Sequence, residues 1–122
     1  MNIFVSYTTK DHEISLVMLN QISTRLKQIG TVYVDILDNN SLDKQKRVFD
    51  ELDNSDVIVL IVSNNVYNSK WVIKEIERAR KLLIPIISFS VHEIMTFKME
   101  IISTKIEFLL SRKLINNIAF FQ

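Results

Sequence analysis

The chain has 122 residues, of which 48% are hydrophobic and 24% are charged, and these proportions are typical of a folded globular domain and exclude disordered and collagen-like classes. The formal net charge of +1 gives no basic footprint for nucleic acid, and the lack of cysteine excludes disulfides, thiolate zinc sites and a cysteine nucleophile. The single glycine excludes P-loop and ordinary dinucleotide-binding folds, whose phosphate loops need several glycines.

Five short runs rich in isoleucine, valine and phenylalanine are predicted strands. They cover residues 3–7, 32–36, 57–62, 84–89 and 118–121. The third and fourth runs are almost continuously apolar, which is typical of strands that are covered on both faces. We therefore expect these two strands in the middle of a parallel sheet.

Four segments with helical periodicity alternate with the strands. They cover residues 11–30, 41–52, 70–82 and 92–112. Asp11 is expected to cap the start of the first helix and Gly30 its end, while Ser69 is expected to cap the third helix. Alternating strands and helices predict a doubly wound α/β fold with a five-stranded parallel sheet and helices on both faces.

The chain contains no linker, repeat or low-complexity segment, so we expect a single domain over residues 1–122. Its longest apolar runs fall far short of the ~20 residues of a membrane helix, and no signal-like segment begins the sequence. We expect a cytoplasmic protein with no membrane partner and no nucleic-acid partner.

Polar residues follow the first two predicted strands. Tyr7 and Thr8 come after the first strand and Asp35 ends the second. Each is ordinary loop chemistry when taken alone, and aspartate is common in turns. Ligands of parallel sheets, however, bind at the carboxyl ends of the strands, so the shared position of these residues indicates a site.

Glu75 is the unusual carboxylate of the third predicted helix. The apolar arc that faces the sheet consists of Val72, Ile76, Ala79 and Leu83. Glu75 lies beside this arc on the flank of Trp71, whereas Glu77 points well away from it. Glu77 is therefore predicted to be an ordinary solvated residue.

Two interpretations of Glu75 are open at this point. A boundary carboxylate that pairs with Arg78 or Lys74 is the ordinary one. Against it, Lys70 and Lys74 stand in the first turns, where positive charge opposes the helix dipole, and this placement favours the docking of an anion. Trp71 is either an amphipathic cap on the edge of the core or an aromatic wall that stacks a flat ligand and raises the pKa of the neighbouring acid.

Three stretches of the chain together resemble a TIR domain, the Toll and interleukin receptor homology fold, of bacterial type. IFVSYTTKD (residues 3–11) resembles the F-I-S-Y-x-x-x-D box of the first strand, and VYVD (residues 32–35) resembles the second strand. The block at residues 54–87 resembles the pattern S-x-W-[VC]-x-x-E followed by a strand with an I-P-I core. The likeness covers residues 3–89.

The resemblance implies a flavodoxin-like fold, with the last helix shortened or absent because the chain ends just after the fifth predicted strand. The family contains adaptors that act by self-association and enzymes that cleave the nicotinamide–ribose bond of NAD. By this resemblance Glu75 is the catalytic acid, and Tyr7, Thr8, Asp35 and Trp71 line the nucleotide site. It implies no metal and no cofactor, because NAD is the substrate.

The first hypothesis is therefore a TIR-domain NAD glycohydrolase or cyclase that is active on self-association with further copies or other TIR domains, in phage defence or signalling. The alternative is a non-catalytic TIR adaptor, and a third reading is a related nucleotide-binding or deoxyribosyl-transfer protein. The spacing from Trp71 to Glu75 favours the enzyme. The short loop at residues 37–44, which lacks glycine and proline, favours the adaptor.

Overall fold

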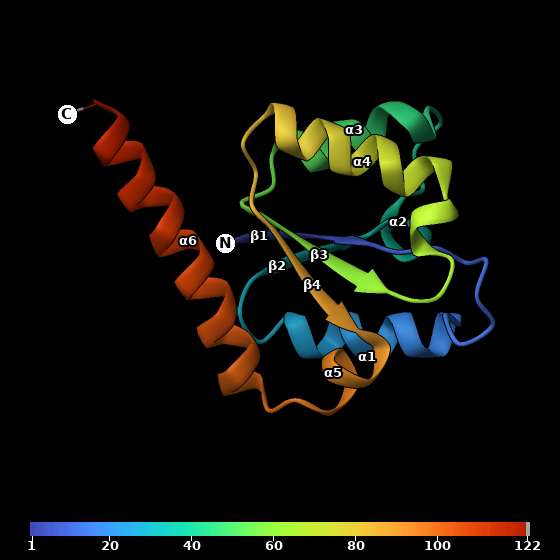
Figure 1. Ribbon diagram of the computed structural model, residues 1–122. Helices are drawn as coiled ribbons and strands as arrows, with labels where there is room; N and C mark the ends of the chain where they lie inside the picture. The colour runs from blue at the N-terminus through green and yellow to red at the C-terminus, as the bar shows by residue number, and fades with distance from the viewer. Residues whose placement is uncertain (122) are drawn as a thin grey trace.

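The structure, a computed structural model, describes the backbone of residues 1–121 and the side chains of residues 1–113. Within residues 1–121 one sheet of four parallel strands forms in the order β2-β1-β3-β4 (Figure 1). The strands are β1 (Asn2–Ser6), β2 (Thr31–Val34), β3 (Val57–Val62) and β4 (Ile86–Ser90). The chain reverses its direction of winding between β1 and β3, so the carboxyl end of β1 lies at the switch point.

Helices cover both faces of the sheet, which confirms the predicted α/β class. Figure 1 shows α3 and α4 on one side of the sheet and α1 and α5 on the other. The bounds are α1 (Leu16–Leu26), α2 (Asp35–Asp38), α3 (Lys44–Asp53), α4 (Lys70–Lys81), α5 (Val91–Thr96), α6 (Met99–Phe121) and the short 3-10 turn η1 (Val66–Asn68). None of the helices that the structure describes is long and apolar enough to cross a membrane.

Alternation along β1 divides the core into two layers. Ile3 and Val5 pack with α1, α5 and the first half of α6, whereas Phe4 packs with Tyr33 and Leu52 on the side of α3 and α4. Successive side chains of a strand point to opposite faces, so one short strand supplies both layers. β1 and β3 are consequently buried on both faces. The prediction that β4 also lies in the middle of the sheet is wrong, because no further described strand pairs with its outer edge, and β4 is only partly buried.

The fifth strand predicted at residues 118–121 is not formed, because these residues belong to α6. A four-residue apolar run cannot be told from a helical segment by its periodicity, and no glycine or proline interrupts residues 99–121. The prediction that a final helix after this strand is shortened or absent therefore does not apply, because residues 99–121 form one helix. The single helix predicted over residues 92–112 is instead two helices, separated at Phe97 by extended backbone.

The predicted Ser69 cap of α4 is confirmed, since the Ser69 hydroxyl accepts a hydrogen bond from the N–H of Val72. The predicted Asp11 cap of α1 is wrong, because Ser15 caps that helix. The carboxylate of Asp11 accepts hydrogen bonds from the backbone N–H of Asn65 at 2.8 Å and from its side-chain amide at 2.7 Å. Asp11 thus fastens the loop after β1 to the loop after β3.

Gly30 does not cap α1, whose C-cap is Lys27, but serves a close approach between backbones. A Cβ at Gly30 would lie 2.5 Å from the carbonyl oxygen of Met1. That oxygen accepts the N–H of Thr31 at 2.8 Å, which holds it in the ladder between β1 and β2. Neither backbone can move away without breaking this pairing.

Gly30→Ala is therefore expected to lower the free energy of unfolding by about 1–3 kcal/mol, because overpacking forces the backbones apart. Urea unfolding followed by circular dichroism measures this change. Gln28→Ala, at an exposed position nearby, is the matched control and should change the stability by less than about 0.5 kcal/mol. Equal stabilities of the two variants would contradict the close approach.

Candidate functional site

A cavity of about 490 Å³ opens at the carboxyl ends of β1 and β2 and reaches the first turns of α4. Its place beside the switch point is where ligands of doubly wound sheets bind. All five residues singled out from the sequence line it. The full lining is Val5, Tyr7, Thr8, Thr9, Asp35, Ile36, Asn39, Lys44, Gln45, Val48, Ser69, Trp71 and Glu75.

Glu75 projects from α4 toward the sheet and is only 8% exposed. Val72 and Ala79 of the same helix are fully buried, and residues three and four positions apart share a helix face. The cap at Ser69 fixes where α4 begins and hence which residues form this face. The acid is thus held at the cavity by the same face that anchors the helix.

Burial raises the pKa of Glu75 to about 8, and the negative charge of Asp35 contributes to the rise. The hydroxyl of Ser6 nearby opposes it slightly, although its buried oxygen makes no hydrogen bond of ordinary geometry. The carboxyl group is therefore largely protonated at neutral pH. It will ionise readily when positive charge approaches.

The described side chains form no ion pair with Glu75, so the boundary-carboxylate interpretation does not match the geometry. Arg78 instead binds Asp53, with two N···O distances of 2.5 and 2.6 Å. The ammonium group of Lys74 lies 5.0 Å from the centre of the Trp71 ring. Both candidate partners of Glu75 are engaged elsewhere.

Asp35, at the start of the single turn α2, is held by two donors. The hydroxyl of Tyr33 and the side-chain amide of Asn39 donate to the same carboxylate oxygen at 2.7 and 2.8 Å. The hydroxyl of Tyr7 accepts the N–H of Ile36 at 3.0 Å, which joins the end of β1 to α2. Burial raises the pKa of Tyr7 to about 12, so its phenol stays neutral.

Thr8 and Trp71 form other parts of the wall. Thr8 is buried, and its hydroxyl accepts the N–H of Lys10 at 3.2 Å. Trp71 is 43% exposed and packs at a tilt against Phe49, with 6.5 Å between the ring centres. A large aromatic surface therefore borders the cavity and remains available to a flat ligand.

Two polar lining residues, Asn39 and Lys44, are not among the predicted site residues, although Asn39 follows the second strand at the edge where a site is expected. Asn39 is buried and donates from its side-chain amide to the carbonyl of Lys44 at 3.0 Å, while its own carbonyl accepts the ammonium group of Lys44 at 2.9 Å. Lys44 is the one cation among the described residues that line the cavity, whereas Lys70 and Lys74 do not line it. Asn39 stands four residues after Asp35, a spacing that would have indicated the contact had the turn at residues 35–38 been expected.

The cavity combines a protonated carboxyl group, a fixed carboxylate, an aromatic wall and one cation. Such a set suits a ligand with hydroxyl groups, a flat ring and an anionic portion. Across the described residues, no group of three histidine, aspartate or glutamate side chains is arranged to hold a metal ion. The carboxyl groups of Glu75 and Asp35 line the cavity and are the candidates for chemistry at this site.

Two comparisons with known proteins bear on this geometry. A search of curated proteins finds no match. The model of the TIR domain family matches residues 3–107, a stretch that contains all four strands and every residue that lines the cavity. On this match, the chain belongs to the TIR domain family.

Proposed function

We propose that this TIR domain cleaves the nicotinamide–ribose bond of NAD, as a glycohydrolase or cyclase, with Glu75 as the catalytic carboxylate. The observation that carries the proposal is the burial of Glu75 in a nucleotide-sized cavity beside Tyr7, Thr8, Asp35 and Trp71. The family includes members that cleave NAD, which is consistent with this assignment. The proposal makes NAD the substrate and requires no further cofactor.

One buried carboxylate is sufficient for this reaction. The bond between the ribose C1′ and the pyridine nitrogen breaks, and its electron pair stays on nicotinamide, which leaves neutral and needs no proton. Most glycosidases need a second carboxyl group because their leaving group departs as an alkoxide. The ionised carboxylate of Glu75 would orient the ribose hydroxyls and stabilise the positive charge that develops on the ribose.

The reaction is completed by attack on C1′. Water gives ADP-ribose and releases a proton, and attack by a nitrogen of the same molecule's adenine gives a cyclic product. The cationic nicotinamide ring favours ionisation of Glu75, since opposite charge lowers the pKa of a carboxyl group. Binding of the substrate therefore produces the reactive form of the acid.

The other lining residues have roles that follow from their chemistry. Trp71 offers a face on which a flat ring stacks, and Asp35 adds negative charge near the cationic ring. Lys44 offers positive charge for the phosphates of the dinucleotide. Tyr7 and Thr8, which directly follow β1, form part of the wall of the cavity.

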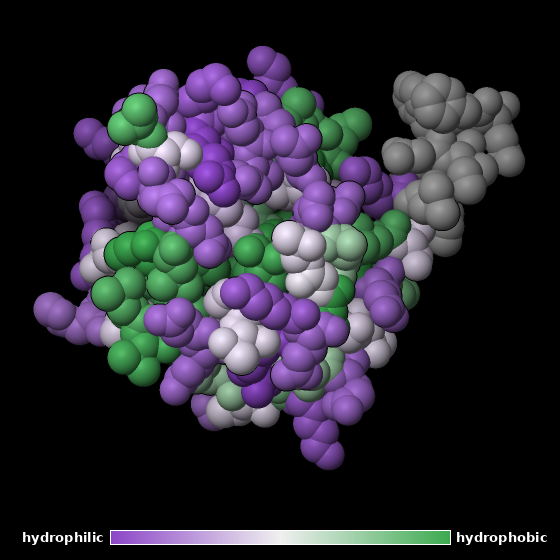
Figure 2. Space-filling view, turned by 180° about the vertical axis from the view of Figure 1, so that it is seen from behind, coloured by the Kyte–Doolittle hydropathy of each residue, from purple (hydrophilic) through white to green (hydrophobic). Residues whose placement is uncertain are grey.

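Association with other TIR domains is part of the proposal, because TIR domains generally interact with one another. Three apolar side chains, Leu16, Val17 and Ile36, are exposed in α1 and α2, which contact each other. Figure 2 shows apolar surface gathered on the side of the molecule away from α6. Ile36 also lines the cavity, so a neighbour seated there would lie next to the substrate. The same surface favours the second candidate function, a non-catalytic TIR adaptor.

Glu75→Gln is expected to lower NAD turnover by about 10²–10³-fold, because it removes the carboxylate that faces the developing positive charge. Nicotinamide release by the purified protein, at concentrations that promote self-association, measures this loss. Glu77→Gln is the matched control, since Glu77 lies on the exposed side of the same helix. Undiminished turnover in Glu75→Gln would exclude the catalytic role, and no turnover by the associated wild-type protein would favour the adaptor.

The pH dependence of kcat/KM for NAD should report the ionisation of Glu75. Because the ionised form is reactive and the pKa is about 8, kcat/KM should rise about tenfold per pH unit and level off above that value. Asp35→Asn removes a negative charge that raises this pKa, so the rising limb should move to lower pH even if the rate falls. A profile that is flat between pH 6 and roughly 9 would be incompatible with the proposed role.

Glu75 should also cost stability in a pH-dependent way. Its pKa in the folded state, about 8, exceeds the ordinary 4.5, so the folded state holds the proton more tightly and its stability falls as pH rises from 4.5 to 8. Glutamine carries no such penalty, and Glu75→Gln should therefore gain on the wild type across this window by an amount on the order of a few kcal/mol. Melting temperatures of both proteins and of Glu77→Gln at a series of pH values test this, and a difference that does not vary with pH would show that the acid is not desolvated.

A further inference from the structure

The strand β4 leaves one edge of the sheet open, because among the described residues it pairs only with β3. The N–H of Ile58 in β3 donates to the carbonyl of Pro85 at 2.9 Å. In a parallel strand alternate residues direct their backbone groups to the same neighbour, so those of Ile87 and Phe89 face β3 as well. The N–H and C=O groups of Ile86 and Ser88 consequently point to the open side.

The open stretch of β4 is closed at both of its ends. Before it, the N–H of Ile84 donates to the carbonyl of Ala79 at 2.8 Å. After it, the N–H of Ser90 donates to the carboxylate of Glu93 at 2.8 Å, within the capping box of α5. An added strand of a few residues would fit between these limits.

A cavity of about 250 Å³ runs beside this edge, between β4 and α6. Phe108, which is 64% exposed, contributes an apolar wall, and Lys105 and Arg112 contribute cations. The guanidinium group of Arg112 lies 6.0 Å from the centre of the Phe108 ring. The full lining is Ile87, Ser88, Phe89, Glu93, Lys105, Phe108, Leu109 and Arg112.

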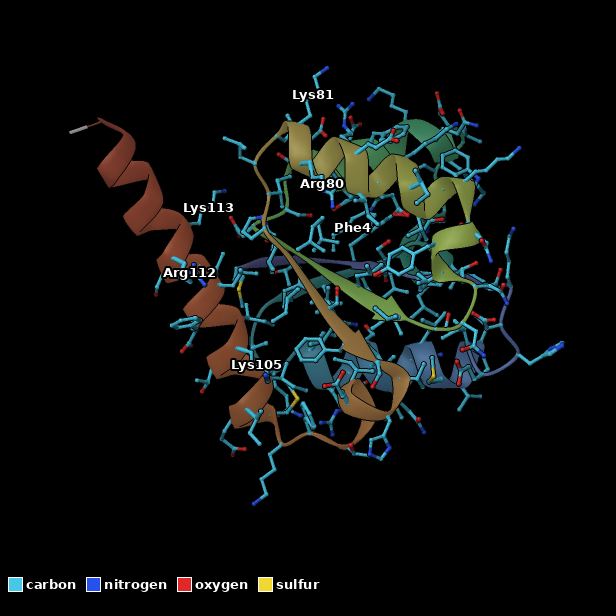
Figure 3. The ribbon with its side chains drawn as sticks, in the orientation of Figure 1. Phe4, Arg80, Lys81, Lys105, Arg112 and Lys113 are labelled. Atoms are coloured by element: carbon cyan, nitrogen blue, oxygen red, sulfur yellow. The ribbon has the colours of Figure 1, made fainter. Side chains whose placement is uncertain are left out.

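Positive charge lies along α6 and at the end of α4, where Lys81 points away from the sheet (Figure 3). Arg80 and Lys81 stand at the end of α4, directly before the turn into β4, while Lys105, Arg112 and Lys113 lie along α6. None of these five forms a salt bridge in the part of the chain whose side chains are described. The edge is therefore bordered by cations that form no close ion pair there.

The acidic side chains nearby offset these cations only in part. Glu100 and Glu107 lie about 140° to 160° around α6 from Lys105, on the opposite face of the helix. Glu93 lines the cavity, and its negative charge acts on Lys105, so it offsets one of the five cations. The local charge is positive although the chain as a whole is nearly neutral.

We propose that the open edge of β4 binds an extended acidic segment of a partner protein, which adds to the sheet as a further strand. Its backbone would pair with Ile86 and Ser88, an apolar side chain would enter the cavity at Phe108, and its acidic side chains would meet the flanking cations. A second copy of this chain fits less well, because its own β4 would bring the same cations together. This site lies at the opposite edge of the sheet from β2 and does not depend on the proposed activity.

The direct test is fluorescence anisotropy with a labelled peptide of roughly eight residues that alternates valine with glutamate. Saturable binding that weakens with added salt is expected. The same peptide with lysine in place of glutamate tests charge, and a version N-methylated at its central amides tests strand pairing. Each change should weaken binding about tenfold or more, since each removes charge attraction or a backbone hydrogen bond.

Variants of the protein test the same contacts. Arg112→Glu should weaken binding of the acidic peptide about tenfold, whereas Lys27→Glu, an equal charge change at the exposed end of α1, should leave it within about twofold. Ser88→Pro removes an outward N–H and should abolish binding without a loss of melting temperature, because proline is tolerated on strand edges. If Ser88→Pro fails to fold, the N-methylated peptide applies the same test to the unaltered protein.

Several results would overturn the proposal. Equal binding of acidic and basic peptides, or equal binding of the N-methylated peptide, would show that neither charge nor strand pairing operates. Stronger binding of an oligonucleotide than of the acidic peptide would assign the cations to nucleic acid. If the protein does not bind the peptide but forms a dimer, and Ser88→Pro dissociates that dimer, the open edge of β4 binds a second copy of the chain instead.

Discussion

The pairing of β1 with both β2 and β3 is the contact on which the rest of the molecule depends. Among the described residues, β1 alone pairs with a strand from each half of the winding, β2 on one edge and β3 on the other. Its carboxyl end is therefore where the helices of the two halves diverge. Before β1, the Met1 carbonyl lies close to Gly30. After β1, Asp11 binds Asn65 and so joins the loops that follow β1 and β3. The cavity is a consequence of that pairing, since tight packing on both faces leaves the strand ends uncovered.

Burial of Glu75 places an ionisable group where its charged form lowers the stability of the fold. A carboxyl group on the packed face of α4 costs free energy in the ionised form, and an apolar residue of similar size would pack there without that cost. The cost is concentrated at one residue, because Glu77 of α4 is exposed and Asp53 of the neighbouring α3 is paired with Arg78. A destabilised group in an otherwise consistent core is what a functional site is expected to look like.

The two outer strands of the sheet meet solvent in different ways. At β2 the N–H of Val34 is bonded by the side chain of Asp38 at 2.7 Å, so the chain itself covers the end of that edge. At β4 no such side chain covers the middle of the strand within the described residues, and the cations of α4 and α6 border it instead. Uncovered edges invite pairing with other chains, and charge beside them selects which chains can approach. A carboxylate thus covers the end of each outer strand, and the two strands differ in the positive charge that borders β4.

The sequence by itself determined the elements whose signals are local. Continuous apolar runs located β3 and β4, Ser69 located the start of α4, and the helical position of Glu75 set it apart from Glu77. Local signals could not decide between a strand and a helix at residues 118–121, because a short apolar run suits both and no breaker stood before it. Three features could be seen only in the folded chain. Asp11 binds Asn65, and Asn39 and Lys44 complete the lining of the cavity. Gly30 is required by the close approach of the Met1 carbonyl and not by the end of α1. These contacts join segments that are distant in the sequence or lie across a turn that was not predicted. They form only when the strands assemble into the sheet, so no local pattern of residues predicts them.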